Sequence, residues 1–123
     1  VLSLIQKYND VKSYFLLDVE FPYIFSASKN DFKNIAIRFS EFESIDTVIK
    51  FKGLIDWIWI DTFTKLPLNQ NVINVLKSFK TCLVCPGRWN RPGDISFYKN
   101  QLKNMKFSVN AVMTSKHSAK LWI

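Results

Sequence analysis

Short apolar runs alternate along the chain with longer stretches in which apolar residues recur every three or four positions. Such runs are typical of buried β-strands, and the longer stretches are typical of amphipathic helices. The predicted strands cover residues 13–18, 34–39, 55–61, 81–85 and 107–114. In the third predicted strand, residues 55–61, large apolar side chains would lie on both faces of the sheet, as in a strand that is covered on both sides.

The stretches between the strands carry the signals that begin and end helices. Pro22 suits a first helical turn, Gly53 a helix stop, and Asn69 an N-cap, while Asp94 can begin the last helix. The helices are predicted over residues 2–8, before a turn at Asn9-Asp10, and over 22–28, 44–51, 69–79 and from 94 onward.

Strands that alternate with helices are joined by crossovers, so the sequence predicts a parallel α/β fold with right-handed connections. A doubly wound sheet usually has a glycine-rich phosphate turn, which this chain with its 3 glycines lacks. We therefore predict a partial (β/α)8 barrel of about five parallel strands, in which residues 1–123 form a single domain. An eight-stranded barrel needs roughly three more units. We expect them in the same polypeptide or in another chain.

Polar residues follow the apolar runs where a barrel places its functional groups. Asp18, Arg38, Asp61 and Thr114 each stand at or near the end of a predicted strand. The carboxyl ends of parallel strands share one edge of the sheet. We expect these four side chains to lie along that edge.

The charge distribution narrows the range of partners. The chain has 17 Lys and Arg against 10 Asp and Glu, a formal net charge of +7 that favours acidic ligands. The basic residues are spread singly rather than in a block that could follow a phosphate backbone, so nucleic acid is not an expected partner. No run is apolar enough for a membrane span, and a soluble protein is expected.

The two cysteines, Cys82 and Cys85, fall in one predicted strand that would direct their thiols to opposite faces. His117 is the one histidine, so a structural zinc site lacks ligands. We interpret both cysteines as small apolar core residues in a reducing compartment, which predicts a cytoplasmic protein.

The order YFLLD, IAIRFSEFE, DWIWIDTFTKLPL, CLVCP and AVMTS resembles the later strands of glycerophosphodiester phosphodiesterase-like proteins, closest to uncharacterised bacterial relatives. Their superfamily includes phosphatidylinositol-specific phospholipase C. The resemblance implies hydrolysis of a phosphodiester by two histidines, with early-strand carboxylates holding a divalent cation such as Mg²⁺ or Ca²⁺. It places these groups before Val1. We therefore assign no catalytic or metal-binding residue within the chain, which we expect to be inactive alone.

The resemblance implies that this chain forms the far wall of a pocket that binds a phosphate and its head group. Arg38 is the leading candidate, because a guanidinium can hold a phosphate bidentately; an ion pair to Asp18, Glu41 or Asp61 is the alternative. The other candidate substrate-binding residues are Asp18, Glu20, Asp61, Lys65, Thr114 and Trp122.

One position departs from the family pattern. Gly87 stands where an acidic residue is expected after the proline that ends the fourth strand. This favours a second hypothesis beside the hydrolase: a non-catalytic barrel remnant that binds a phosphorylated small molecule or a protein partner.

Overall fold

The computed structural model describes residues 2–8, 11 and 13–123 of the chain. The turn predicted at Asn9-Asp10 lies outside the described residues. The elements, in chain order, are α1 (Leu2–Lys7), β1 (Leu16–Leu17), α2 (Phe21–Lys29), β2 (Ile35–Phe39), α3 (Ile45–Lys50), β3 (Trp57–Ile60), α4 (Gln70–Leu76), β4 (Lys80–Val84), α5 (Ile95–Asn104), β5 (Ala111–Met113) and α6 (Lys116–Ala119), with short 3₁₀ turns η1 (Pro86–Trp89), η2 (Pro92–Asp94) and η3 (Lys120–Trp122).

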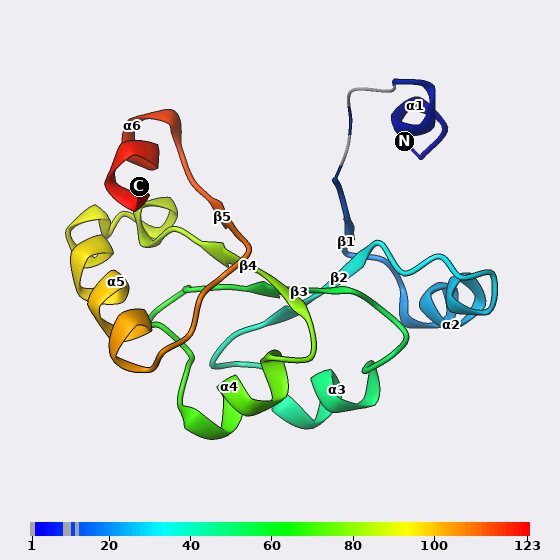
Figure 1. Cartoon of the computed structure of the whole chain (residues 1–123), viewed down its shortest axis with the longest axis horizontal. Coiled ribbons are helices and arrows are strands. Elements are labelled where there is room, and N and C mark those ends of the chain that lie inside the picture. Colours follow the sequence, from blue (N-terminus) through cyan, green and yellow to red (C-terminus); the bar gives the residue numbers. More distant parts are fainter. Residues whose placement is uncertain (1, 9–10, 12) are drawn as a thin grey trace.

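The five strands form one sheet in the order β1-β2-β3-β4-β5, and every neighbouring pair is parallel. The sheet is curled into an open half-barrel, with helices α2 to α5 around its outside (Figure 1). Because strand order follows chain order without reversal, right-handed crossovers place the connecting helices on the same side. The predicted parallel α/β fold is confirmed.

The main core lies between the sheet and its helices. The strand residues Ile37, Ile58 and Leu83 face it, and Ile58 and Leu83 are fully buried. Helix residues such as Val48 and Leu76 complete it from the other side. Burial of this apolar surface is the main term that stabilises the sheet against the helical layer.

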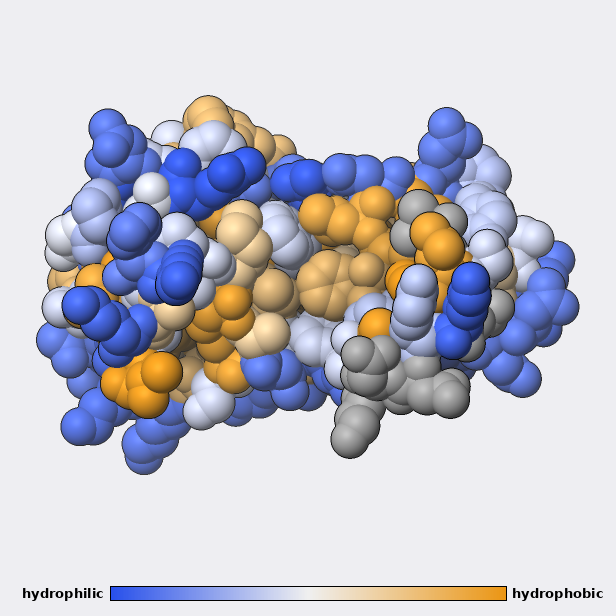
Figure 2. Space-filling view, turned by 90° about the horizontal axis from the view of Figure 1, so that it is seen from above, coloured by the Kyte–Doolittle hydropathy of each residue, from blue (hydrophilic) through white to orange (hydrophobic). Residues whose placement is uncertain are grey.

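The opposite, concave face of the sheet has a second, smaller apolar cluster. Ala36, Trp57 and Cys82 are buried there. Partly buried side chains surround them, and all of these come from the strands or the segment before β1: Phe15, Leu17, Trp59, Ala111 and Met113. Figure 2 looks onto the molecule from the open side and shows apolar residues gathered in the middle, between hydrophilic ends.

Side chains cap the starts of α3, α4 and α6, at Ser44, Asn69 and Ser115, but not the start of α5. Asn69 accepts a hydrogen bond from the Val72 amide at 2.9 Å, and Ser44 caps α3 by accepting from the Asp46 amide. Asp94 precedes α5 but makes no side-chain cap, because its carboxylate is held by Arg91 at 2.8 Å.

The two edge strands are shorter than the sequence predicted. Strand β1 pairs with β2 over two residues, because Asp18 has a left-handed backbone (φ 62°) that turns the chain away. Strand β5 begins at Ala111 rather than near Phe107, whose side chain is instead buried in the core on the helix side. Edge strands lack a second neighbour to enforce pairing, so local turns decide their length.

Both cysteines are buried free thiols, as predicted. Burial raises the pKa of Cys82, which disfavours the reactive thiolate. Within the described ranges, every helix is too short or too polar to cross a bilayer.

Candidate functional site

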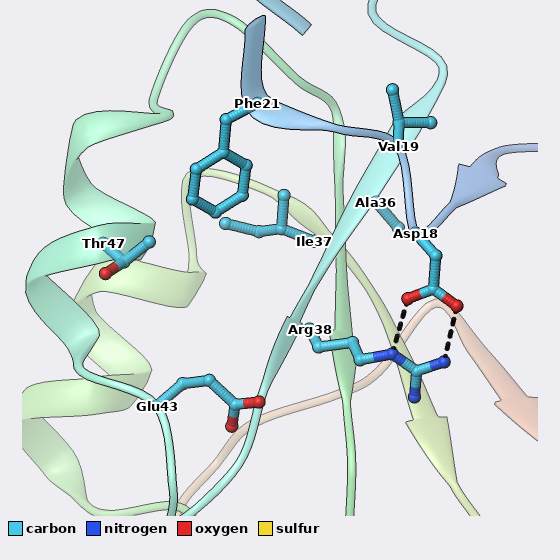
Figure 3. Close-up of a pocket in the computed structure, with 8 residues that line it drawn as sticks. All are labelled: Asp18, Val19, Phe21, Ala36, Ile37, Arg38, Glu43 and Thr47. Atoms are coloured by element: carbon cyan, nitrogen blue, oxygen red, sulfur yellow. Dashed lines mark hydrogen bonds and ion pairs between the residues drawn. The ribbon is translucent and has the colours of Figure 1, made fainter. Parts of the chain in front are cut away.

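Three strand ends bring one ion-paired cluster together at the carboxyl edge of the sheet. Arg38 on β2 donates from Nε and Nη2 to the two carboxylate oxygens of Asp18, at 2.8 and 2.9 Å. Its Nη1 donates a longer bond of 3.4 Å to Asp61, which follows β3. Figure 3 shows the paired contacts between Arg38 and Asp18. Of the three ion-pair partners that the sequence allowed for Arg38, Asp18 and Asp61 are found here, whereas Glu41 is bonded to Thr64 instead.

Asp18 reaches Arg38 through an uncommon backbone conformation. Its φ of 62° lies in the left-handed region, which costs most residues about 1 kcal/mol or more but is tolerated by Asp and Asn. The turn ends β1 and places the carboxylate beside β2. The local cost is offset by the bidentate, charge-assisted contact that it permits.

The guanidinium of Arg38 is held on one edge and open on another. Asp18 occupies the Nε and Nη2 edge, whereas the Nη1 and Nη2 edge carries only the long contact to Asp61. The guanidinium carbon lies 5.8 Å from the ring centre of Trp59, a cation–π distance that limits its rotation. With 41% of its side chain exposed, Arg38 is oriented yet accessible.

An aromatic rim borders the cluster and was not predicted from the sequence. Trp89, in the turn after β4, donates its indole N–H to Asp61 at 2.8 Å. Its ring packs edge-on against Phe63 at 4.6 Å, and Phe63 packs against Phe42 at 5.7 Å. The sequence offered one signal for this rim, because all three residues follow the ends of predicted strands. Apolar rings in exposed loops favour contact with a ligand or another surface.

The electrostatics follow from these contacts. The hydrogen bonds from Arg38 lower the pKa of Asp18, and the same contact raises the pKa of Arg38. Both side chains are largely exposed, at 63% and 41%, so solvent screening limits the pair to roughly 1 kcal/mol or less. The pair therefore orients groups more than it stabilises the fold.

A hollow of about 320 Å³ opens beside the cluster on the helix side of β2. Ile37 forms part of its floor, and Phe21, Glu43 and Thr47 form parts of its walls, with Arg38 and Asp18 at one end (Figure 3). The hollow exists because β1 ends at Asp18, where the chain turns away from β2. Its mixed lining suits a small molecule with both polar and apolar parts.

The remaining candidate residues do not join the cluster. Glu20 is exposed at the start of α2, and Lys65 lies near Glu41, whose carboxylate accepts bonds from the Thr64 amide and hydroxyl. Thr114 lines a separate hollow with Arg88, beyond β4 and β5. Trp122 packs on the core of the helix side and lines a hollow with residues preceding β5, and His117 is exposed on α6.

Asp18 and Asp61 do not fit a metal site as they stand. The guanidinium of Arg38 sits between them and takes the place that a cation would occupy. Over the described ranges, no three His, Cys, Asp or Glu side chains are grouped closely enough to hold a metal ion. We derive no chemical step through a metal bound by these residues.

The comparisons with known proteins leave the family open. The chain matches no known protein family, no curated protein and no solved structure. The class of protein that the fold and site define is therefore a parallel α/β half-barrel with an Arg-centred polar cluster at its carboxyl edge.

The titration of Asp18 tests the geometry of the cluster. Its folded-state pKa is lowered, so the stability it contributes is present above its unfolded value near 4 and is lost as pH falls through the folded value. Carbon-detected NMR should show Asp18 titrating below the ordinary range. In R38A the midpoint should rise toward the ordinary value; an unchanged midpoint would show that Arg38 does not hold Asp18 in solution.

Proposed function

We propose that this chain forms the far wall of the pocket of a phosphoric diester hydrolase, and that Arg38 contacts the phosphate of a phosphorylated polyol. The observation that carries the proposal is a guanidinium that Asp18 fixes at its Nε and Nη2 edge and whose Nη1 makes only a long contact of 3.4 Å to Asp61. A planar fork of donors matches two phosphate oxygens. Fixing it in advance lowers the entropy that binding costs.

The carboxylates favour a polyol as the alcohol part of the ligand. Asp18 and Asp61 carry more negative charge than the single guanidinium offsets, so a multiply charged phosphate would be repelled more strongly than a singly charged one. A diester carries one negative charge, and its hydroxyls can donate to carboxylate lone pairs that Arg38 leaves unused. The cluster thus offers acceptors for hydroxyls beside donors for one phosphate.

The resemblance in the strand-end sequences supports the same substrate class. In glycerophosphodiester phosphodiesterase-like proteins the substrate is a diester of glycerol, which has both features. Under this proposal the acid, the base and the metal ligands come from outside these residues, and the chain contributes orientation. Trp89 acts through Asp61, so we regard it as a positioning residue rather than a catalytic one.

Binding of glycerophosphoglycerol and of glycerol to this chain tests the proposal. We expect the diester to bind with a Kd on the order of millimolar and glycerol to bind more weakly. R38A should weaken diester binding about 10- to 100-fold, since a hydrogen bond to a charged group is worth about 1.5–3 kcal/mol. K77A, an equal charge change at the exposed end of α4, should leave the affinity within about twofold.

Two results would contradict the assignment of Arg38. One is the absence of diester binding by the parent chain at tens of millimolar ligand. The other is an equal loss in R38A and K77A, which would attribute the binding to the overall charge of +7.

A non-catalytic binding role is the second candidate, favoured by the two carboxylates that already neutralise Arg38. Turnover separates the two functions. If the protein is a hydrolase, the barrel completed by the missing units should release glycerol phosphate from the diester when Mg²⁺ or Ca²⁺ is added. The R38A substitution should then cause a large loss of turnover. Diester binding without turnover under either metal would favour the binding role.

A further inference from the structure

The charges of the chain are unevenly divided between its two halves. Residues 62–123 contain ten Lys and Arg and a single acidic residue, Asp94, whereas residues 1–61 contain seven Lys and Arg and nine Asp and Glu. The basic half includes β4, β5 and every element after β3. Its one carboxylate is already paired with Arg91 at 2.8 Å. A field of this sign attracts anions toward the β4 and β5 side of the molecule.

A hollow of about 260 Å³ opens on that side, at the carboxyl ends of β4 and β5. The turn η1 supplies Gly87 and Arg88, and the segment that leaves β5 supplies Thr114 and Ser115. Met113, at the end of β5, adds an apolar wall. We call this space the Arg88 hollow. Its volume is just below the usual range of ligand pockets, about 300–1,000 Å³, so it suits a small molecule.

Arg88 alone is charged among the described residues that line the Arg88 hollow. It is exposed, and it forms no ion pair with any residue that the structure describes. Arg38 and Arg91, in contrast, each hold a carboxylate at 2.8 Å. A guanidinium without a carboxylate partner keeps its positive charge and its fork of N–H donors for a ligand.

Two hydroxyl groups accompany Arg88 in this lining. Ser115 Oγ accepts a hydrogen bond from the Ser118 amide at 3.3 Å, so its hydroxyl proton is still available to a ligand. Thr114 Oγ1 reaches the Ser115 carbonyl only at 3.4 Å, which is longer than a normal O–H···O bond, and it can exchange that contact for a ligand oxygen. Donors from three side chains suit the several oxygens of a tetrahedral phosphate better than the planar pair of a carboxylate.

The charge around the Arg88 hollow distinguishes it from the Arg38 cluster. Arg38 has the carboxylates of Asp18 and Asp61 at 2.8 and 3.4 Å, which disfavour a doubly charged ligand. The described lining of the Arg88 hollow contains no acidic side chain. A phosphate monoester carries about −1.5 to −2 charges at pH 7. We propose that the Arg88 hollow is a second anion site, independent of Arg38, that binds the phosphate of a small monoester.

Binding of glycerol 3-phosphate to this chain, followed in two-dimensional NMR spectra, tests the proposal. The backbone amides of Arg88 and Ser115 should shift and saturate with one Kd on the order of millimolar, while the Arg38 Nε–H resonance stays unmoved. R88M should weaken binding at least about tenfold, because methionine keeps most of the length but neither the charge nor the donors. K77M, the same charge change at the exposed end of α4, should leave the affinity within about twofold.

The hydroxyl and the ligand class are tested separately. T114V keeps the shape of the side chain but removes the hydroxyl, and should weaken binding about 2- to 10-fold. Acetate should bind at least about tenfold more weakly than glycerol 3-phosphate, because it has less charge and fewer oxygens. Inorganic phosphate should also bind more weakly, because it lacks carbon atoms to lie against Met113.

Several results would overturn the proposal. An equal loss in R88M and K77M would attribute binding to the overall charge, and shifts centred on Arg38 would place the monoester at the other cluster. Unchanged affinity in T114V, or no saturation at tens of millimolar ligand, would remove the site. Acetate that binds as tightly as the monoester would exclude phosphate as the recognised group, and equally tight inorganic phosphate would assign the hollow to free phosphate instead.

Discussion

Ile58→Ala is expected to lower the free energy of unfolding by about 2–5 kcal/mol. Ile58 is fully buried at the middle of β3, between β2 and β4, and faces the core on the helix side. Removing its outer atoms leaves a cavity that neighbouring side chains on both strands cannot fill together. The loss is a large part of the roughly 5–15 kcal/mol of a typical domain, and urea unfolding measures it.

Ile49→Ala is the matched control for that substitution. Ile49 lies on α3 and is 48% exposed, so its truncation should change stability by no more than about 0.5 kcal/mol. Similar effects of the two substitutions would mean that β3 is not the centre of the sheet, which would contradict the strand order.

Arg91→Met is expected to lower the free energy of unfolding by about 2–4 kcal/mol, the second largest effect. Arg91 donates to the backbone oxygens of Thr62 and Phe63 and to the Asp94 carboxylate and Tyr98 hydroxyl, and so joins the loop after β3 to α5. Methionine keeps most of the length but none of the donors. The partly buried acceptors of Arg91 would then lack a hydrogen-bond donor, and each would carry a desolvation cost.

Arg88→Met serves as the control, because Arg88 is exposed three residues earlier in the same connection. It should change stability by no more than about 0.5 kcal/mol. Arg91→Lys should recover only a small part of the loss, since a single ammonium cannot reach acceptors on both sides as a guanidinium does. Full recovery by lysine, or equal losses at both arginines, would show that the network does not form in solution.

The order of elements could be predicted from the sequence because each rests on a local pattern. Apolar runs such as residues 55–61 are too short and too uniformly apolar for surface helices, and Asn69 marks a helix start with its own side chain. The lengths of β1 and β5 could not be predicted. They depend on the left-handed turn at Asp18 and on the packing of Phe107, which tertiary contacts decide.

The candidate site was predictable in part for a similar reason. Parallel strands deliver their ends to one edge, so Asp18, Arg38 and Asp61 could be grouped before any contact was known. The contribution of Trp89 could not, because it depends on how a 3₁₀ turn after β4 aims one indole at Asp61. Trp122 was a candidate substrate-binding residue, but the turn η3 sets it against α5 and the segment before β5.

The response of the Trp89 indole N–H resonance to glycerophosphoglycerol in two-dimensional NMR spectra tests most directly whether the strand ends converge on a phosphate. If the ligand binds at the carboxyl edge, this resonance and the Arg38 Nε–H should shift together and saturate with one Kd, and the Trp89 shift should vanish in R38A. Saturable shifts confined to the lysine-bearing side of α5, with Trp89 and Arg38 unmoved, would contradict the convergence of the strand ends on a phosphate.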